Sequence, residues 1–344
     1  MSGANFISAR YDAAAAAWLP SNYAAVARSV VSASASSRKT HAHIMPTMLT
    51  GAGTIPIRIG NLPVPRWFQA ETSSVLQKMT LRPNDVVLAS WPKSGTHWVY
   101  RAIRLLTMGA AFPDSPMTLA EMLPPTRPPE PLDKAPWNPT GLDSFEDLLG
   151  REPENARIIV SHAPPNMLPP LLGSPTGKLV YVARDPKDVV TSNYFFMGTP
   201  KDGWDGSMNR FLASAEETPN AFGGWFEHVK SFEALIHELG PTRACLIEYE
   251  GMHDDMKGCL TRLAKLLGPD SERILEEQGD EIMKALGFDV MKAEGASQHI
   301  LRKGQAGGWT EHFSKEDEAR LQEQLDARLP RTEASLAGVG AWRG

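Results

Sequence analysis

The segment from Val86 to Leu106, VVLASWPKSGTHWVYRAIRLL, restricts the fold of this chain more than any other stretch. It opens with an apolar run of strand length, turns at a proline and a glycine, and continues with apolar residues at helical spacing. A strand, a tight turn and a helix in this order direct the unpaired first N–H groups of the helix toward one place. Lys93 and the hydroxyls of Ser94 and Thr96 add a cation and two donors, so the turn predicts a site for a phosphate-type anion.

The same turn allows a plainer interpretation. A short Lys-Ser-Gly turn that caps a helix is common, and the usual P-loop pattern GxxxxGK[ST] is absent because Lys93 precedes Gly95. Taken alone, the turn leaves an anion site and an ordinary helix cap both open.

Two later segments favour the anion site. The apolar run LVYVA is followed by Arg184 and, eight residues further on, by Ser192. A third segment, RKGQAGGW, begins with Arg302, Lys303 and Gly304. Guanidinium groups bind phosphate through paired hydrogen bonds, so arginine at two of these positions is compatible with a bound anion. Each basic residue taken alone is equally compatible with a solvated surface charge.

The motifs PKSGTHW, RDPKDVVTSNYFF and RKGQAGGW, in this order between Asp85 and Phe313, resemble the signatures of the cytosolic sulfotransferase family. Members of that family use the donor 3′-phosphoadenosine 5′-phosphosulfate (PAPS). The resemblance implies an α/β fold: a single three-layer α/β/α domain with a central parallel sheet, the P-loop-NTPase-like sulfotransferase fold. It also implies transfer of a sulfuryl group from PAPS, as co-substrate, to a hydroxyl or amine of a small-molecule acceptor, with no metal.

The resemblance also implies the roles of individual residues. The segment IVSHAP is similar to the catalytic-histidine segment of the family, so His162 is expected to be the general base. Lys93 is expected to stabilise the charge that develops on the leaving oxygen. PAPS carries a 5′-phosphosulfate and a 3′-phosphate, so the resemblance implies a second anion site, formed by Arg184, Ser192, Arg302, Lys303 and Gly304. The expected donor-binding residues are Lys93, Ser94, Gly95, Thr96, His97, Trp98, Arg184, Ser192, Tyr249, Phe288, Arg302, Lys303 and Gly304. The three aromatic residues of this set would stack on adenine, although core packing explains them equally well.

The chain departs from the family pattern at several positions. His97 and Leu286 stand where threonine is usual, and Val160 stands where some members carry a lysine. Gly308 replaces the usual aspartate of a GDW triplet. The short dimer motif of the family is not recognisable after that triplet, so the sequence leaves the oligomeric state open.

Elsewhere, apolar runs of strand length alternate with segments of helical periodicity. This alternation predicts parallel strands with helices on both faces of the sheet. We expect strands at 157–160, 179–183 and 244–249, and helices at 70–79, 187–194, 222–239 and 257–267.

Composition limits the partners and the compartment. A net charge of −5 argues against binding nucleic acid or a membrane surface by bulk charge. The only two cysteines, Cys245 and Cys259, favour a reducing compartment, and no apolar run is long enough for a membrane span. These features predict a cytoplasmic protein.

The first fifty residues differ from the rest. They are rich in Ala and Ser, carry several arginines, and contain Asp12 as the only acidic residue before Glu71. This composition fits a transit peptide for a plastid or mitochondrion, and it fits a disordered or docked extension equally well. We expect residues 51–344 to form the sulfotransferase domain.

Residues 108–154 are dense in proline and are expected to be irregular. This segment is either a wall of the acceptor pocket, with Phe112, Trp137 and Phe145 as apolar lining, or a disordered surface insertion.

Two other functions remain open at this level. A nucleotide or small-molecule kinase with an atypical P-loop would need Mg²⁺ ligands and a lysine after the glycine, and neither is evident. A non-catalytic nucleotide-binding protein of the same fold would need neither Lys93 nor His162, and the presence of both favours the enzyme.

Overall fold

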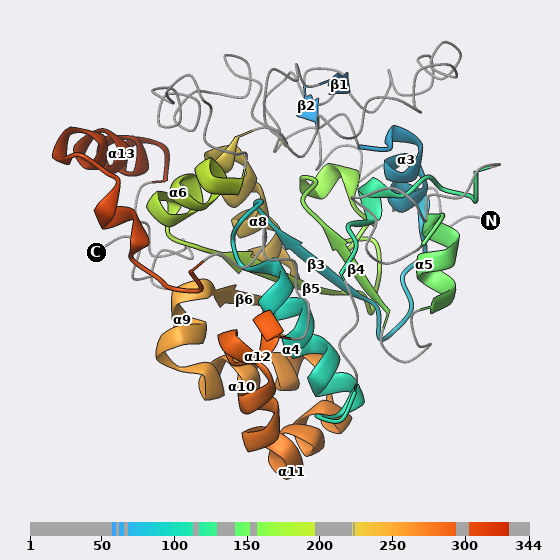
Figure 1. Ribbon diagram of the computed structural model, residues 1–344. Helices are drawn as coiled ribbons and strands as arrows, with labels where there is room; N and C mark the ends of the chain where they lie inside the picture. Colours follow the sequence, from blue (N-terminus) through green and yellow to red (C-terminus); the bar gives the residue numbers. More distant parts are fainter. Residues whose placement is uncertain are drawn as a thin grey trace.

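The computed structural model describes residues 57–59, 62–64, 68–112, 117–128, 142–151, 157–196, 222, 224–293 and 303–329 (Figure 1). Helices and strands alternate along most of this length, and the η elements are 3₁₀ helices. In chain order they are β1 Ile57–Ile59, β2 Leu62–Val64, α3 Ala70–Lys78, β3 Val86–Ser90, α4 Thr96–Met108, η2 Ala120–Met122, α5 Phe145–Arg151, β4 Ile158–Ser161, η3 Pro165–Met167, β5 Lys178–Ala183, α6 Pro186–Phe196, α8 Trp225–Leu239, β6 Ala244–Glu248, α9 Tyr249–Asp254, α10 Met256–Leu267, α11 Pro269–Ala285, α12 Phe288–Ala293, η5 Gly308–Glu311 and α13 Lys315–Arg328.

The central sheet has four strands in the order β4-β3-β5-β6, and all of its pairs are parallel. Successive residues of β3 enter opposite core clusters, because side chains alternate between the faces of a sheet. Val87 and Ala89 pack with α3 and α8, whereas Val86 and Leu88 pack with α4, α10 and α11 (Figure 1). Helices therefore cover both faces, and the prediction of a three-layer α/β domain with a parallel sheet is confirmed.

A buried ion pair fixes the start of two adjacent strands. Asp85, directly before β3, accepts from Nε of Arg157, directly before β4, at 2.7 Å, and a second bond joins the same two side chains. Both residues are buried, and Asp85 also accepts from the amide of Arg82 at 2.7 Å. Because paired hydrogen bonds satisfy both charges, this contact sets the register in which β3 and β4 enter the sheet.

The structure corrects several expectations. The stretch 108–154 contains η2 and α5 rather than being irregular throughout its described part. Phe145 is 1 % exposed in the core around α5, so its prediction as a pocket wall is wrong. Trp137 and residues 1–50, with the transit-peptide hypothesis, lie outside the described residues.

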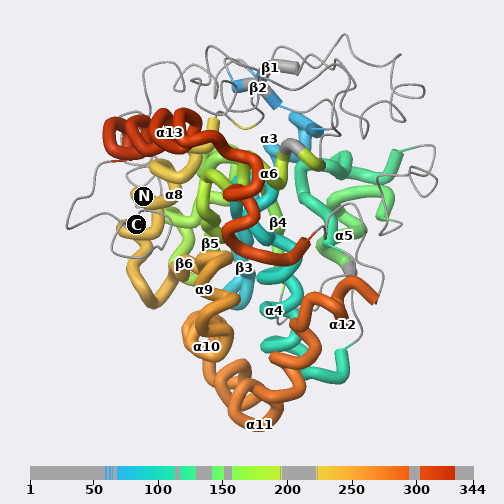
Figure 2. Tube along the Cα trace, turned by 60° about the vertical axis from the view of Figure 1, so that its left-hand side comes forward, coloured from blue at the N-terminus to red at the C-terminus, as the bar shows by residue number. Residues whose placement is uncertain are grey.

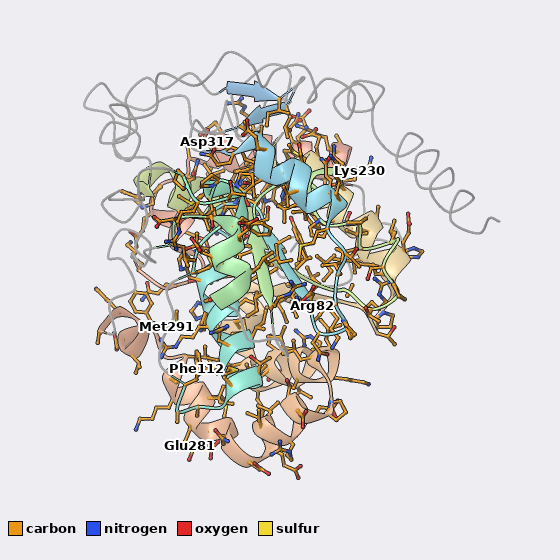
Figure 3. All side chains as sticks on the ribbon, turned by 90° about the vertical axis from the view of Figure 1, so that its right-hand side faces the viewer. Arg82, Phe112, Lys230, Glu281, Met291 and Asp317 are labelled. Atoms are coloured by element: carbon orange, nitrogen blue, oxygen red, sulfur yellow. The ribbon has the colours of Figure 1, made fainter. Side chains whose placement is uncertain are left out.

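The C-terminal part of the chain lies against α6, which contacts η5. Figure 2 shows the red segment that follows α12 passing α6 on its way to α13. The labelled side chains of Phe112 and Glu281 in Figure 3 mark the end of the molecule where α4 and α11 meet.

In the part of the chain that the structure describes, none of the helices combines the length and the apolar character needed to span a bilayer.

Candidate active site

Each strand of the sheet delivers a candidate residue directly after its last residue. The turn that contains Lys93, Ser94, Gly95 and Thr96, called the anion turn below, follows β3. His162 follows β4, Arg184 follows β5, and Tyr249 follows β6. Parallel strands place their carboxyl ends at one edge, so residues far apart in the sequence meet there. The chain leaves β3 toward β4 on one side of the sheet, and it leaves β5 toward β6 on the other side. The gap between two adjacent strands with such opposite connections is the usual position of a ligand crevice in these sheets.

The anion turn is a tight loop that is closed by hydrogen bonds. The amide of Ser94 closes it by donating to the Trp91 carbonyl at 3.3 Å, and the hydroxyls of Ser90 and Thr96 lie 2.6 Å apart. Gly95 caps α4 with a φ of 99°, and a Cβ there would lie 2.5 Å from the ring of Tyr249. Only glycine fits this position, which lets the first amides of the helix face the crevice.

Lys93 also has an unusual backbone. Its φ is 71°, in the left-handed region that costs a non-glycine residue about 1 kcal/mol or more. Such conformations cluster at functional sites, where the surrounding structure holds them. The left-handed backbone of Lys93 therefore marks this turn as a candidate functional site.

His162 has a defined tautomer. Its Nδ1 lies 2.8 Å from the Ser90 carbonyl oxygen, which can only accept, so Nδ1 carries the proton. The pKa of His162 is lowered to about 4, chiefly by burial, with the bond to Ser90 raising it and the charge of Lys93 lowering it. A neutral imidazole therefore presents Nε2 as a proton acceptor.

The second imidazole beside the turn is also neutral near pH 7. Burial lowers the pKa of His97 to about 3, with further contributions from the charges of Lys93 and His162. The positive charge at this end of the site is therefore that of Lys93 alone among these three side chains.

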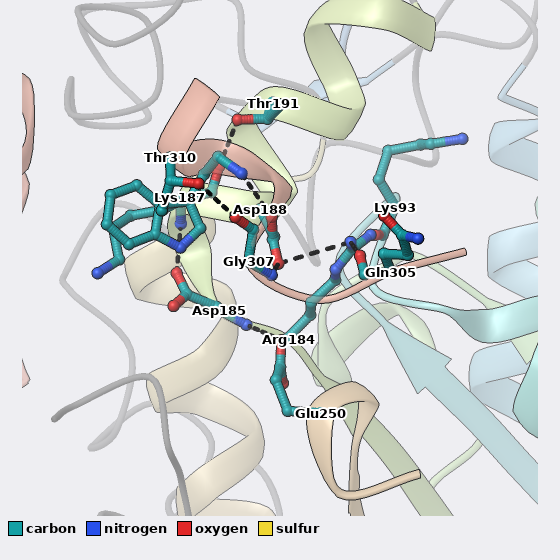
Figure 4. Close-up of polar contacts among 11 residues, drawn as sticks. Lys93, Arg184, Asp185, Lys187, Asp188, Thr191, Glu250, Gln305, Gly307 and Thr310 are labelled. Atoms are coloured by element: carbon teal, nitrogen blue, oxygen red, sulfur yellow. Dashed lines mark hydrogen bonds and ion pairs between the residues drawn. The ribbon is translucent and has the colours of Figure 1, made fainter. Parts of the chain in front are cut away.

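Arg184 joins three parts of the site (Figure 4). Its Nη1 donates to the Lys93 carbonyl at 3.1 Å, and its Nη2 donates to the Gln305 carbonyl at 3.2 Å. The guanidinium carbon lies 4.0 Å from the centre of the Tyr249 ring. The buried Nε has no hydrogen-bond partner among the described residues. A buried cationic donor without a partner fits an anionic ligand at this position.

The segment 303–313 is attached to α6 through Asp188. This buried carboxylate accepts from the amides of Gly307 at 2.7 Å and Trp309 at 3.1 Å, and it lies 3.7 Å from Nη2 of Arg184 (Figure 4). Lys187 adds a cation–π contact, with its Nζ 3.9 Å from the centre of the Trp309 ring. Asp188 therefore links the C-terminal segment to the arginine of the second predicted anion site.

We expect Asp188→Ala to loosen this segment. Two amides would lose their charged acceptor, and a hydrogen bond to a charged group contributes about 1.5–3 kcal/mol. Hydrogen exchange of the peptide covering 303–313 should become about tenfold faster or more. Asp289→Ala on the exposed side of α12 is the matched control. If the exchange of 303–313 were the same in both variants, the attachment assigned to Asp188 would be wrong.

The remaining residues of the second predicted anion site are only partly brought together. Ser192 is half-buried on α6, and Gly304, with a φ of 62°, packs against the ring of Phe288. Lys303 is exposed and pairs with Glu311 at 2.6 Å rather than lying on Arg184. Arg302 lies outside the described residues.

An aromatic cluster flanks the turn on the α9 side. The ring centres of Trp98 and Tyr249 are 5.5 Å apart, and His253 lies 4.8 Å from Trp98 and 4.9 Å from Tyr249. The indole N–H of Trp98 donates to the Leu286 carbonyl at 3.0 Å, which brings it near Phe288. Sequence reasoning missed His253, although its spacing of four residues after Tyr249 places both on one face of α9.

A buried glutamate near His162 was also missed. Glu121 of η2 accepts from the His162 amide at 2.7 Å. Burial raises the pKa of Glu121 to about 7, and its hydrogen bonds from His162 and Ser161 act in the opposite direction. In the described ranges, no group of three or more histidine, cysteine, aspartate or glutamate side chains is placed to hold a metal ion.

Comparisons with known proteins agree with this geometry. A family model described as "Sulfotransferase domain" matches residues 83–333. The chain is 28% identical to mouse sulfotransferase 2B1 over 277 residues, covering 75% of each chain. It is 30% identical to human sulfotransferase 4A1 over 237 residues, covering 68% of this chain and 76% of that protein.

Solved structures show the same fold. The chain resembles mouse sulfotransferase SULT7A1, crystallised with PAP, with a TM-score of 0.59 and 23% identity, covering 81% of this chain and 97% of that one. It also resembles a retinol dehydratase in complex with androsterone and the inactive cofactor PAP, with a TM-score of 0.55 and 24% identity, covering 76% and 85% of the two chains. Because the family model matches most of the length of this chain, the chain belongs to the sulfotransferase family.

Proposed function

We propose that this protein transfers a sulfuryl group from PAPS to a hydroxyl or amine of a small-molecule acceptor. The observation that carries the proposal is the tautomer of His162, which leaves Nε2 unprotonated beside Lys93 and the anion turn. A proton acceptor next to an anion turn is the combination that a direct group transfer needs. Membership of the sulfotransferase family supports the reaction class.

We infer that PAPS is held at two anion sites and one aromatic site. The 5′-phosphosulfate would bind the anion turn, and the 3′-phosphate would bind Arg184, whose buried Nε has no partner among the described residues. Adenine would contact Trp98 and Tyr249, with His253 at their side. The PAP complexes of mouse SULT7A1 and of retinol dehydratase support a PAPS-type donor for this fold.

The proposed reaction is a single displacement at sulfur. The acceptor oxygen or nitrogen attacks the sulfur of PAPS, and its proton moves to Nε2 of His162. The bond from sulfur to the bridging 5′-phosphate oxygen breaks, so that PAP leaves with the electron pair of that bond. Lys93 stabilises the charge that develops on this oxygen. No covalent intermediate on the protein and no metal are needed.

We expect the reaction to persist in mild acid. Burial lowers the pKa of His162 to about 4, and a general base is active only while it is unprotonated. At pH 5.5 roughly 97% of such an imidazole is neutral, compared with about 9% for an ordinary histidine. kcat/KM for PAPS, which reports on the free enzyme, should therefore change less than about twofold between pH 7.5 and 5.5.

Binding of PAP at both pH values is the control for titration of the nucleotide itself, and circular dichroism checks that the protein stays folded. A decrease of kcat/KM to about a tenth at pH 5.5, with PAP affinity and fold unchanged, would contradict the assignment of His162 as the base.

A panel of acceptors tests the function. The protein is incubated with ³⁵S-labelled PAPS and, separately, 2-naphthol, androsterone, retinol and 2-naphthylamine, and the labelled products are identified. Androsterone and retinol are chosen because complexes of retinol dehydratase contain them. Labelled sulfate on any compound, with an equal amount of PAP, supports the proposal. PAP binding without transfer to any compound would favour a non-catalytic nucleotide-binding protein, and phosphate transfer from ATP would favour a kinase.

A further inference from the structure

Two buried side chains, Tyr181 and His228, form a series of hydrogen bonds that ends at the backbone carbonyl of His162. The hydroxyl of Tyr181, on β5, lies 3.0 Å from Nδ1 of His228, on α8. Nε2 of the same His228 ring lies 3.1 Å from the carbonyl oxygen of His162. A carbonyl oxygen can only accept, so Nε2 of His228 carries the proton, and its Nδ1 accepts from the tyrosine.

This series of hydrogen bonds is protected from water. Tyr181 and His228 are each 1 % exposed. Burial lowers the pKa of His228 to about 3 and raises that of Tyr181 well above its usual value, so both side chains are neutral and keep the directions just described. Phe232 stacks on the Tyr181 ring with centres 4.4 Å apart, which fixes the tyrosine.

The other polar groups of His162 are also held. Glu121 accepts from its amide at 2.7 Å, and the Ser90 carbonyl accepts from its Nδ1 at 2.8 Å. With His228 on its carbonyl, three contacts from three elements hold this one residue, and its Nε2 carries no proton. The ring of His228 also meets the edge of Trp91, at the start of the anion turn, with centres 5.5 Å apart.

We propose that Tyr181 and His228 are positioning residues that hold the main chain of His162, and with it the direction of Nε2. The inference rests on the proposed function, because it assigns a purpose to the orientation of the base. Neither side chain contacts the reacting atoms in this assignment. Their effect is on the rate of transfer through the geometry of His162, and donor binding stays largely unchanged.

Four full-length variants test the inference. His228→Ala removes the donor to the His162 carbonyl, whereas His228→Gln keeps an N–H near the position of Nε2. Tyr181→Phe removes only the hydroxyl that donates to Nδ1 of His228. His237→Gln, at an exposed histidine on the same helix, is the matched control.

Three quantities are measured for each variant. The first is kcat with the fastest-sulfated compound of the panel, and the second is the affinity for PAP. The third is the tautomer and pKa of His162 from two-bond ¹H–¹⁵N spectra, with its signals assigned by their loss in His162→Ala.

We expect His228→Ala to lower kcat about 10- to 100-fold, since a small misplacement of a reacting group has effects of this size. His228→Gln should recover most of this loss, and Tyr181→Phe should lower kcat about threefold to tenfold. PAP affinity should change less than about twofold in all four variants, and His237→Gln should match the wild type. The spectra should show altered His162 signals in His228→Ala.

The two proposals fail in different ways. If His162→Ala is inactive while His228→Ala and Tyr181→Phe keep wild-type kcat and wild-type His162 signals, the positioning inference is wrong and the proposed function stands. If His162→Ala itself keeps wild-type turnover, the proposed function of His162 is wrong. Loss of PAP affinity in parallel with kcat would assign His228 a structural role and would also overturn the inference.

Discussion

Replacing His162 by alanine is expected to lower sulfuryl transfer about 1,000-fold, because a positioned general base contributes about 10²- to 10⁴-fold to a rate. The imidazole is neutral, and its Nδ1 donates to the Ser90 carbonyl. Nε2 is therefore the one atom of this side chain that can take the proton of the acceptor. PAP affinity should change less than about threefold, since Nε2 acts on the acceptor and not on the nucleotide.

The measurement is kcat with the best acceptor of the panel, together with a binding isotherm for PAP. His237→Ala, at an exposed position on α8, is the matched control and should behave as the wild type. Retention of more than a tenth of wild-type kcat in His162→Ala would exclude His162 as the general base.

Replacing Lys93 by methionine is expected to lower kcat about 100-fold, which is the typical effect of removing one group that stabilises transition-state charge. Methionine has a similar length and keeps the apolar stem, so the variant removes little except the charge. The charge of Lys93 lowers the pKa of His97 and of His162, so it acts on both imidazoles. The pKa of His162 should therefore rise in the variant.

Lys230→Met is the control, because Lys230 is an exposed lysine on α8 (Figure 3). The comparison uses kcat at saturating PAPS, so that weaker donor binding does not contribute. A kcat within twofold of the wild type in Lys93→Met would remove this lysine from the proposed chemistry.

The strands and their order along the chain were predictable because β3, β4, β5 and β6 are short, mostly apolar runs that are largely buried. The positions of His162 and Arg184 were predictable for the same reason. Each follows such a run directly, and parallel strands bring those ends together. Prediction of the site thus depended on the periodicity and on the motifs that resemble the family.

Other features depend on packing that no local pattern encodes. The contact of Tyr181 with His228 joins residues 47 positions apart, and within its strand Tyr181 looks like any other apolar core residue. Glu121 lies in a proline-rich stretch that was expected to be irregular, and only its burial identifies it. The lateral order β4-β3-β5-β6 is likewise a tertiary property.

One missed helix did carry a local signal. α13 is highly polar, so its hydrophobic periodicity is weak, but Ser314 and Asp317 form a capping box at its start. The pattern of a serine followed three residues later by an acidic residue was present in the sequence. The segments 1–50 and 129–141 lie outside the described residues, so the predictions made for them stand as predictions.

A rapid-quench experiment tests direct transfer with His162 as the base. The protein is mixed with ³⁵S-labelled PAPS and acceptor, and the label on donor, acceptor and protein is followed through one turnover. We predict that label passes from donor to acceptor with formation of an equal amount of PAP, that none becomes bound to the protein, and that in His162→Ala it stays on the bound donor. Label found covalently on the protein, or transferred by His162→Ala at the wild-type rate, would contradict this mechanism.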